Sequence, residues 1–180
     1  SSWSPLVDVE PGQTVQYAYS TLFQGLGDAI YVTFVENSDN VTTLNGGFAA
    51  REDMYGHFWM RRSMDGGQTW GAETERWEIP VRETKIDREN SWNGDVRIMW
   101  AVDKGFVCPQ RGAFMAFAKV GTYVVEPPTS AWLLNSPNLA TEADPSKIEW
   151  VTLPEGEDGL HNWAASMPGI SEEGHVVPLP

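Results

Sequence analysis

The sequence predicts an all-β protein built from repeated four-stranded antiparallel units. Nine Trp, 17 Gly and 12 Pro among 180 residues, with only 21% charged residues, are typical of short strands that pack through aromatic side chains. No window of about a dozen residues shows a sustained helical period. The chain also repeats itself, since a shift of 73 positions brings matching tryptophans and serines into register.

The repeat defines two copies of one unit. The shift superposes Trp59 on Trp132, Ser63 on Ser136 and Trp77 on Trp150, with Pro80 and Pro154 one residue out of step. Alternating apolar and polar side chains bounded by turn residues predict four strands in each copy. They lie at about 15–24, 29–36, 58–63 and 74–79 in the first, and at about 97–107, 113–120, 131–136 and 148–153 in the second. We expect a single domain over 1–180, with the first unit at about 15–80, the second at about 97–154 and the start of a third at about 170–180.

A distinctive turn follows the third predicted strand of the first unit. Within eight positions it contains Ser63, Asp65, Gly67, Thr69 and Trp70. The carboxylate of Asp65 can fold back onto turn amides, the glycines permit positive φ, and Trp70 can pack behind the turn. We expect these residues to be structural and to hold a β-hairpin.

This string resembles the Asp-box, the Ser-x-Asp-x-Gly-x-Thr-Trp signature of the sialidase-like (BNR-repeat) β-propeller superfamily. The resemblance implies a β-propeller with four-stranded antiparallel blades, of which about two and a half are present, in an incomplete six- or seven-bladed ring. Propellers close with about four to eight blades. We therefore expect the remaining blades to come from a longer chain or from self-association with further copies.

A narrower resemblance concerns the residues at 86–92, 133–160 and 170–175. These stretches are similar to bacterial and fungal sialidase-like proteins, some of them related to lyases and rhamnosidase-type enzymes that attack rhamnosyl-glucuronic acid linkages. Exo-sialidases carry an Arg-Ile-Pro motif, whereas the closest string here is Glu78, Ile79 and Pro80. The resemblance thus implies a carbohydrate-active enzyme with chemistry other than that of a sialidase.

The predicted substrate face consists of the loops that enter the innermost strands and those that join second to third strands. The richest loop, 81–96, supplies three candidate catalytic residues, Asp87, Arg88 and Glu89, and three candidate substrate-binding residues, Arg82, Lys85 and Trp92. Arginine can hold a carboxylate, paired acid and base groups can flank a glycosidic oxygen, and tryptophan can stack on a sugar ring. A solvated loop with mutual ion pairs is the alternative.

Two further groups complete the candidate site. Strand alternation places the candidate catalytic residues Glu173 and His175 on one side of a strand, with His161 as a nearby candidate for substrate binding. A plain ion pair between Glu173 and His175 is the alternative. Arg51 and His57, in the long connection at 37–57, are also candidates for substrate binding. The three histidines lack zinc-motif spacing, so we expect no metal and no cofactor.

Charge restricts the partners. A net charge of −13 disfavours nucleic acid and anionic membranes, which would repel such a surface. The family resemblance implies a secreted or periplasmic enzyme that cleaves a terminal linkage in an acidic, uronate- or sialate-containing oligosaccharide or polysaccharide. Hydrolysis would need two carboxylates, for which Asp87, Glu89 and Glu173 are candidates. β-Elimination would need a base such as His175 and an arginine, Arg82 or Arg88, on the uronate.

A second class of function stays open at this point. Asp-box propellers also serve as non-catalytic modules that bind glycans or proteins, and a fold does not fix a function. A catalytic site would bring ionisable groups together at the channel mouth. A binding module would instead present exposed tryptophan platforms.

Overall fold

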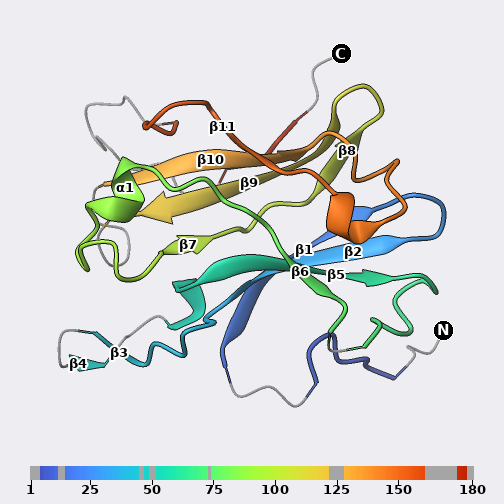
Figure 1. The fold of residues 1–180 in the computed structure, drawn as a ribbon, viewed down its shortest axis with the longest axis horizontal. Coiled ribbons are helices and arrows are strands. Elements are labelled where there is room, and N and C mark those ends of the chain that lie inside the picture. Colours follow the sequence, from blue (N-terminus) through green and yellow to red (C-terminus); the bar gives the residue numbers. More distant parts are fainter. Residues whose placement is uncertain are drawn as a thin grey trace.

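The computed structural model describes residues 5–11, 15–44, 47–48, 52–72, 74–121, 128–160 and 174–177, which form two antiparallel sheets packed face to face (Figure 1). The all-β prediction is confirmed. The longest helix in the described residues is α1 (Lys85–Arg88), and two short 3-10 turns, η1 (Glu52–Met54) and η2 (Pro145–Lys147), occur elsewhere. A separate ribbon is formed by β3 (Thr43–Leu44) and β4 (Gly47–Phe48).

The first sheet is a four-stranded meander. It consists of β1 (Tyr17–Gln24), β2 (Ile30–Glu36), β5 (His57–Ser63) and β6 (Arg76–Glu78), paired in that order. All three pairings are antiparallel. The four strands fall where the alternation of side chains predicts them.

The second sheet repeats the meander with one interruption. Its strands are β7 (Met99–Trp100), β8 (Phe106–Cys108), β9 (Gly112–Val120), β10 (Thr129–Ser136) and β11 (Val151–Leu153), and β7 and β8 both pair with β9. The prediction of one continuous strand at 97–107 is therefore wrong. The chain leaves the sheet between β7 and β8, where the Asp103 carboxylate accepts the Ala116 backbone N–H at 2.7 Å in place of a strand partner.

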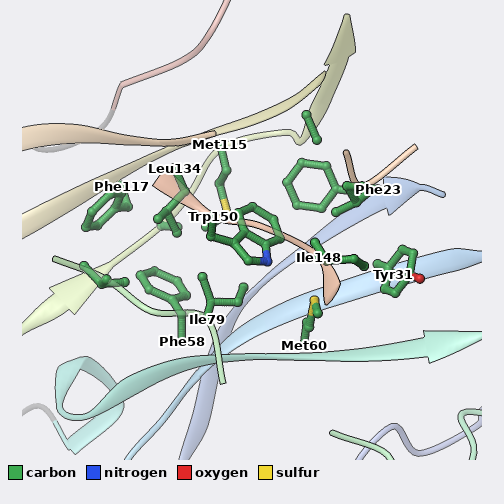
Figure 2. Close-up of a cluster of buried hydrophobic side chains, with 14 of the residues drawn as sticks. Phe23, Tyr31, Phe58, Met60, Ile79, Met115, Phe117, Leu134, Ile148 and Trp150 are labelled. Carbon is green, nitrogen blue, oxygen red and sulfur yellow. The ribbon is translucent and has the colours of Figure 1, made fainter. Parts of the chain in front are cut away.

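The hydrophobic core lies between the two sheets. Phe58 and Phe117 meet edge to face with ring centroids 5.6 Å apart, and Phe23 meets Trp150 at 6.2 Å. Figure 2 shows Met60 and Ile79 beneath Trp150, with Met115 and Leu134 above it. The core thus joins residues from both copies of the repeat.

The two sheets stack head to tail. Phe58 and Met60 of β5 point into the core, but their repeat equivalents in β10, Ala131 and Leu133, occupy the alternate positions and point away from the first sheet. The β10 residues that do enter the core include Trp132, whose equivalent Trp59 is on the outer face of the first sheet. Equivalent faces are therefore not in contact with each other, and the packing is heterologous rather than two-fold.

Contacts between the sheets also join corresponding strands. The Thr21 hydroxyl of β1 donates to the Asp103 carbonyl between β7 and β8 at 3.1 Å, which links the first strands of the two meanders. The Arg82 amide, beyond β6, donates to the Thr152 hydroxyl of β11 at 2.9 Å, which links the last strands. The two meanders therefore stack in the same order and direction.

The turn after β5 has the hydrogen bonds that its sequence predicts. The Asp65 carboxylate accepts the backbone N–H groups of Gln68 and Thr69, both at 2.9 Å, and the Thr69 hydroxyl at 2.7 Å. The Ser63 hydroxyl donates to Asp65 and accepts the Gly67 N–H, and both Gly66 and Gly67 have positive φ. Trp70 is half-buried.

In the matching turn of the second copy, an asparagine makes the side-chain hydrogen bonds to the backbone. Asn138, which stands where the first copy has Asp65, accepts the Glu149 N–H at 2.9 Å and donates to the Lys147 carbonyl at 3.0 Å. The Ser136 hydroxyl still accepts a turn N–H, from Leu139 at 3.1 Å. Asn138 thereby ties its hairpin to the η2 turn.

The Asp65 turn should loosen only in strong acid. Hydrogen bonds from Thr69 and then from Ser63 lower the pKa of Asp65 from 3.8 to about 2. A lowered folded-state pKa stabilises the fold above the unfolded value, and this contribution is lost as the pH falls from 3.8 toward about 2. A carboxyl NMR titration is expected to show Asp65 protonating near pH 2, with the Thr69 amide signal moving in parallel. Protonation near pH 4, with no change at Thr69, would contradict this account.

Candidate functional site

The connections predicted to form the substrate face meet at one end of the two sheets. Figure 1 shows α1 and the β3–β4 ribbon at the end where β2 and β9 finish and β5 and β10 begin. The Ser91 N–H donates to the Gly121 carbonyl at 2.7 Å, so the connection after α1 is tied to the end of β9. The described parts of these connections therefore share one face.

Asp87 has a buried, structural position. It is the third residue of α1, and its carboxylate closes a capping box with Thr84 by accepting the Thr84 N–H at 2.8 Å and hydroxyl at 2.9 Å. Lys119 of β9 donates to the same carboxylate oxygen at 2.5 Å. Because Asp87 is only 5% exposed, the structure gives it a role in holding α1 rather than contact with a substrate.

Lys119 is a residue that the sequence reasoning missed. Its ammonium also donates to the Arg82 carbonyl at 2.6 Å and the Thr84 hydroxyl at 3.1 Å, and it lies 5.0 Å from the centroid of the Trp132 ring. Burial lowers the pKa of Lys119, and the charge of Asp87 opposes that shift. The one signal in the sequence is a lysine inside a strand of otherwise apolar residues.

The two arginines of this loop attach it to the segment after β11. The Arg82 guanidinium donates to the carbonyls of Pro154, at 2.6 Å, and of Gly156. Arg88 pairs with Glu157 at 2.7 Å, and this hydrogen bond raises the pKa of Arg88 and lowers that of Glu157. Arg82 is thus engaged by backbone, whereas the Arg88 guanidinium stays about half exposed.

Lys85 and Glu89 lie on the open side of α1. Their charged groups are 3.8 Å apart, and both side chains are exposed. They border a hollow of about 300 Å³, lined by Lys85, Ile86, Glu89, Pro128, Ser130 and Asp158. Trp92 is not part of it, because its half-buried ring packs edge to face on Tyr55 with centroids 5.8 Å apart.

His175 pairs with a carboxylate that the sequence did not single out. Its Nδ1 is 2.7 Å from the Asp103 carboxylate, whose other oxygen holds the Ala116 N–H. The Asp103 side chain is 1% exposed and the His175 side chain 60% exposed. A buried carboxylate that holds Nδ1 orients an imidazole and leaves Nε2 toward solvent, as a proton-transferring histidine requires.

His57 lies in a different place. It is the first residue of β5, and its Nδ1 is 2.7 Å from the Glu78 carboxylate of β6. The neighbouring Trp59 carries the Arg76 guanidinium 4.1 Å from its ring centroid, on the outer face of the first sheet. No hydrogen bond or ion pair in the described part of the chain connects His57 with His175 or with α1.

Three candidates, Arg51, His161 and Glu173, lie outside the described residues. Among the residues that the structure does describe, no group of three or more His, Cys, Asp or Glu side chains could hold a metal ion. The described helices include none long and apolar enough to cross a membrane. The expectations of no metal and no membrane partner stay predictions.

Comparison with protein-family models, with curated proteins and with solved structures found no match for this chain. Its function must therefore be inferred from the geometry of its own residues.

Proposed function

We propose that the two sheets are neighbouring blades of a sialidase-like β-propeller. Three features support this: the first sheet is a four-stranded meander that the second repeats with its first strand split into β7 and β8, the two sheets stack in the same order, and the contact is heterologous. A heterologous contact leaves one unmatched face at each end of the stack, and repeating it leads either to a closed ring or to an open filament. In the proposed six- or seven-bladed ring, the other blades come from a longer chain or from further copies.

The proposed activity is cleavage of a terminal linkage in an acidic glycan, by a secreted or periplasmic enzyme. The observation that carries the proposal is the pair of His175 and Asp103. The pair lies where the first strand of the second unit breaks, which in a propeller is the strand that lines the central channel. A base positioned there meets any sugar that enters the channel.

Of the two reactions open to this class, β-elimination has the better support. Nε2 of His175 removes the proton at C5 of a uronate, the electron pair forms the C4–C5 double bond, and the C4–O bond breaks. The leaving oxygen takes a proton from water, and Arg88, whose half-exposed guanidinium pairs with Glu157, is the residue proposed to neutralise the uronate carboxylate. Hydrolysis would need two accessible carboxylates. Of the three candidates, Asp87 is buried in the capping box, Glu89 is exposed at the end of α1, and Glu173 lies outside the described residues.

A non-catalytic, glycan-binding propeller is the second candidate. It is favoured by the fact that charged side chains of the loop at 81–96 already have hydrogen-bond partners within the protein. Arg82 bonds to backbone, Arg88 to Glu157, and Asp87 to Lys119. Such pairing is typical of a structural surface, and under this alternative the His175 pair is structural too.

Replacing His175 by alanine is expected to lower turnover of a uronate-containing oligosaccharide by about 10²–10⁴-fold, because a positioned base contributes that much. Asp103→Asn should lower turnover less, since the imidazole remains but loses its charged partner. Release of new chain ends, measured over a panel of acidic glycans, gives both numbers. Lys147→Ala, which changes an exposed residue on η2, is the control. Equal turnover of parent and His175→Ala would remove His175 from the mechanism.

A further inference from the structure

The hollow beside α1 has the lining of a small sugar subsite. Its volume of about 300 Å³ is at the lower end of the range of ligand pockets and suits one monosaccharide ring. Ile86 and Pro128 contribute apolar surface, while Lys85, Glu89 and Asp158 bring charged groups to the rim. The lining of the hollow comes mainly from α1 and the start of β10, which lie at the end of the second sheet where the loops of the predicted substrate face gather (Figure 1).

A buried hydroxyl belongs to this lining as well. Ser130 is 1% exposed, and its oxygen accepts the indole N–H of Trp132 at 2.8 Å. A hydroxyl that accepts from an indole still has its own proton to donate. Ser130 can therefore donate to a ligand oxygen, while the carboxylates of Glu89 and Asp158 accept from ligand hydroxyls.

The charge of the rim selects against an anion. It holds two carboxylates and one ammonium, and that ammonium is already 3.8 Å from Glu89. A uronate placed here would meet net negative charge, whereas the hydroxyls of a neutral sugar would find charged acceptors.

We propose that this hollow binds a neutral pyranose of the glycan, as a subsite separate from the His175–Asp103 pair. The inference rests on the proposed function, because it assigns the neutral sugar of a mixed glycan to the α1 hollow and the uronate to the histidine. Lys119 and Asp87 act behind the hollow as positioning residues, since they hold the helix that carries Lys85, Ile86 and Glu89.

The test measures the binding of simple glycosides to the full chain by ligand-observed NMR. Methyl glucoside and methyl galactoside are the neutral probes, and methyl glucuronide is the anionic one. We expect a neutral probe to bind more tightly than the glucuronide. Asp158→Asn and Glu89→Gln should each weaken its binding about tenfold, because each removes a charge-assisted hydrogen bond. Glu149→Gln, which changes an exposed carboxylate in the segment before β11, should leave binding unchanged.

The result that overturns the proposal is neutral-probe binding that is undetectable, or equally tight in the parent and in Asp158→Asn. The outcome is separable from that of the proposed function. If His175→Ala loses cleavage and the parent binds no neutral probe, the subsite is rejected and the proposed enzymatic function stands. Binding that depends on Asp158, with normal cleavage by His175→Ala, would keep the subsite and reject the mechanism.

Discussion

Replacing Lys119 by methionine is expected to destabilise the protein by about 3–5 kcal/mol. Methionine keeps an unbranched apolar side chain but removes the ammonium that lies over Trp132, and it leaves the Asp87 carboxylate buried without its cation. Breaking a buried ion pair by removing one partner costs that much because the remaining charge stays out of water. The free energy of unfolding in urea, with circular dichroism as the signal, gives the value.

Two further variants make this measurement specific. Lys147→Met removes an exposed ammonium 3.4 Å from Asp144, and should cost no more than about 1 kcal/mol. Lys119→Met combined with Asp87→Asn should recover part of the loss, because no charge then stays buried. A cost for Lys119→Met as small as that for Lys147→Met would show that the ion pair does not hold α1.

Trp132→Ala and Trp59→Ala are expected to differ although the repeat makes the two residues equivalent. Trp132 is fully buried between the sheets, so its removal should cost about 3–5 kcal/mol in lost burial and cavity formation. Trp59 is half-buried on the outer face, where it packs under Arg76 and donates to the Ser38 hydroxyl at 3.3 Å. Its removal should cost about 1–2 kcal/mol.

This comparison tests how the two sheets stack. Both replacements remove the same atoms from the same place in the repeat. The difference between their losses in free energy of unfolding therefore depends on the face of the sheet on which each indole lies. The same urea unfolding assay on the 180-residue chain gives both values. Equal costs would mean that the two equivalent faces have the same environment, which contradicts head-to-tail packing.

The strands could be predicted from the sequence because each unit alternates apolar and polar residues between strong turn signals. The Asp65 turn was equally readable, since its hydrogen bonds form within eight residues. The break between β7 and β8 was not, because it depends on Asp103 meeting the Ala116 amide from a neighbouring strand. Local pattern carries no information on such a contact.

The candidate site was predicted less completely for the same reason. The charged loop at 81–96 could be recognised from its composition. Its pairings could not, because Arg88 pairs with Glu157 and Asp87 with Lys119, partners more than thirty residues away. His175 was found as a titratable residue near the end of the chain, whereas its partner Asp103 precedes it by 72 positions. Pairings over such separations are set by the stacking of the sheets.

Analysis of the products shows whether the protein breaks a uronate linkage by elimination. The protein is incubated with a uronate-containing oligosaccharide in water labelled with heavy oxygen, and the new chain ends are weighed by mass spectrometry. Elimination by His175 predicts an unsaturated uronate product, lighter than the hydrolysis product by one water and free of the label. Incorporation of labelled oxygen at the cleaved linkage, or no cleavage of any acidic glycan offered, would contradict the account.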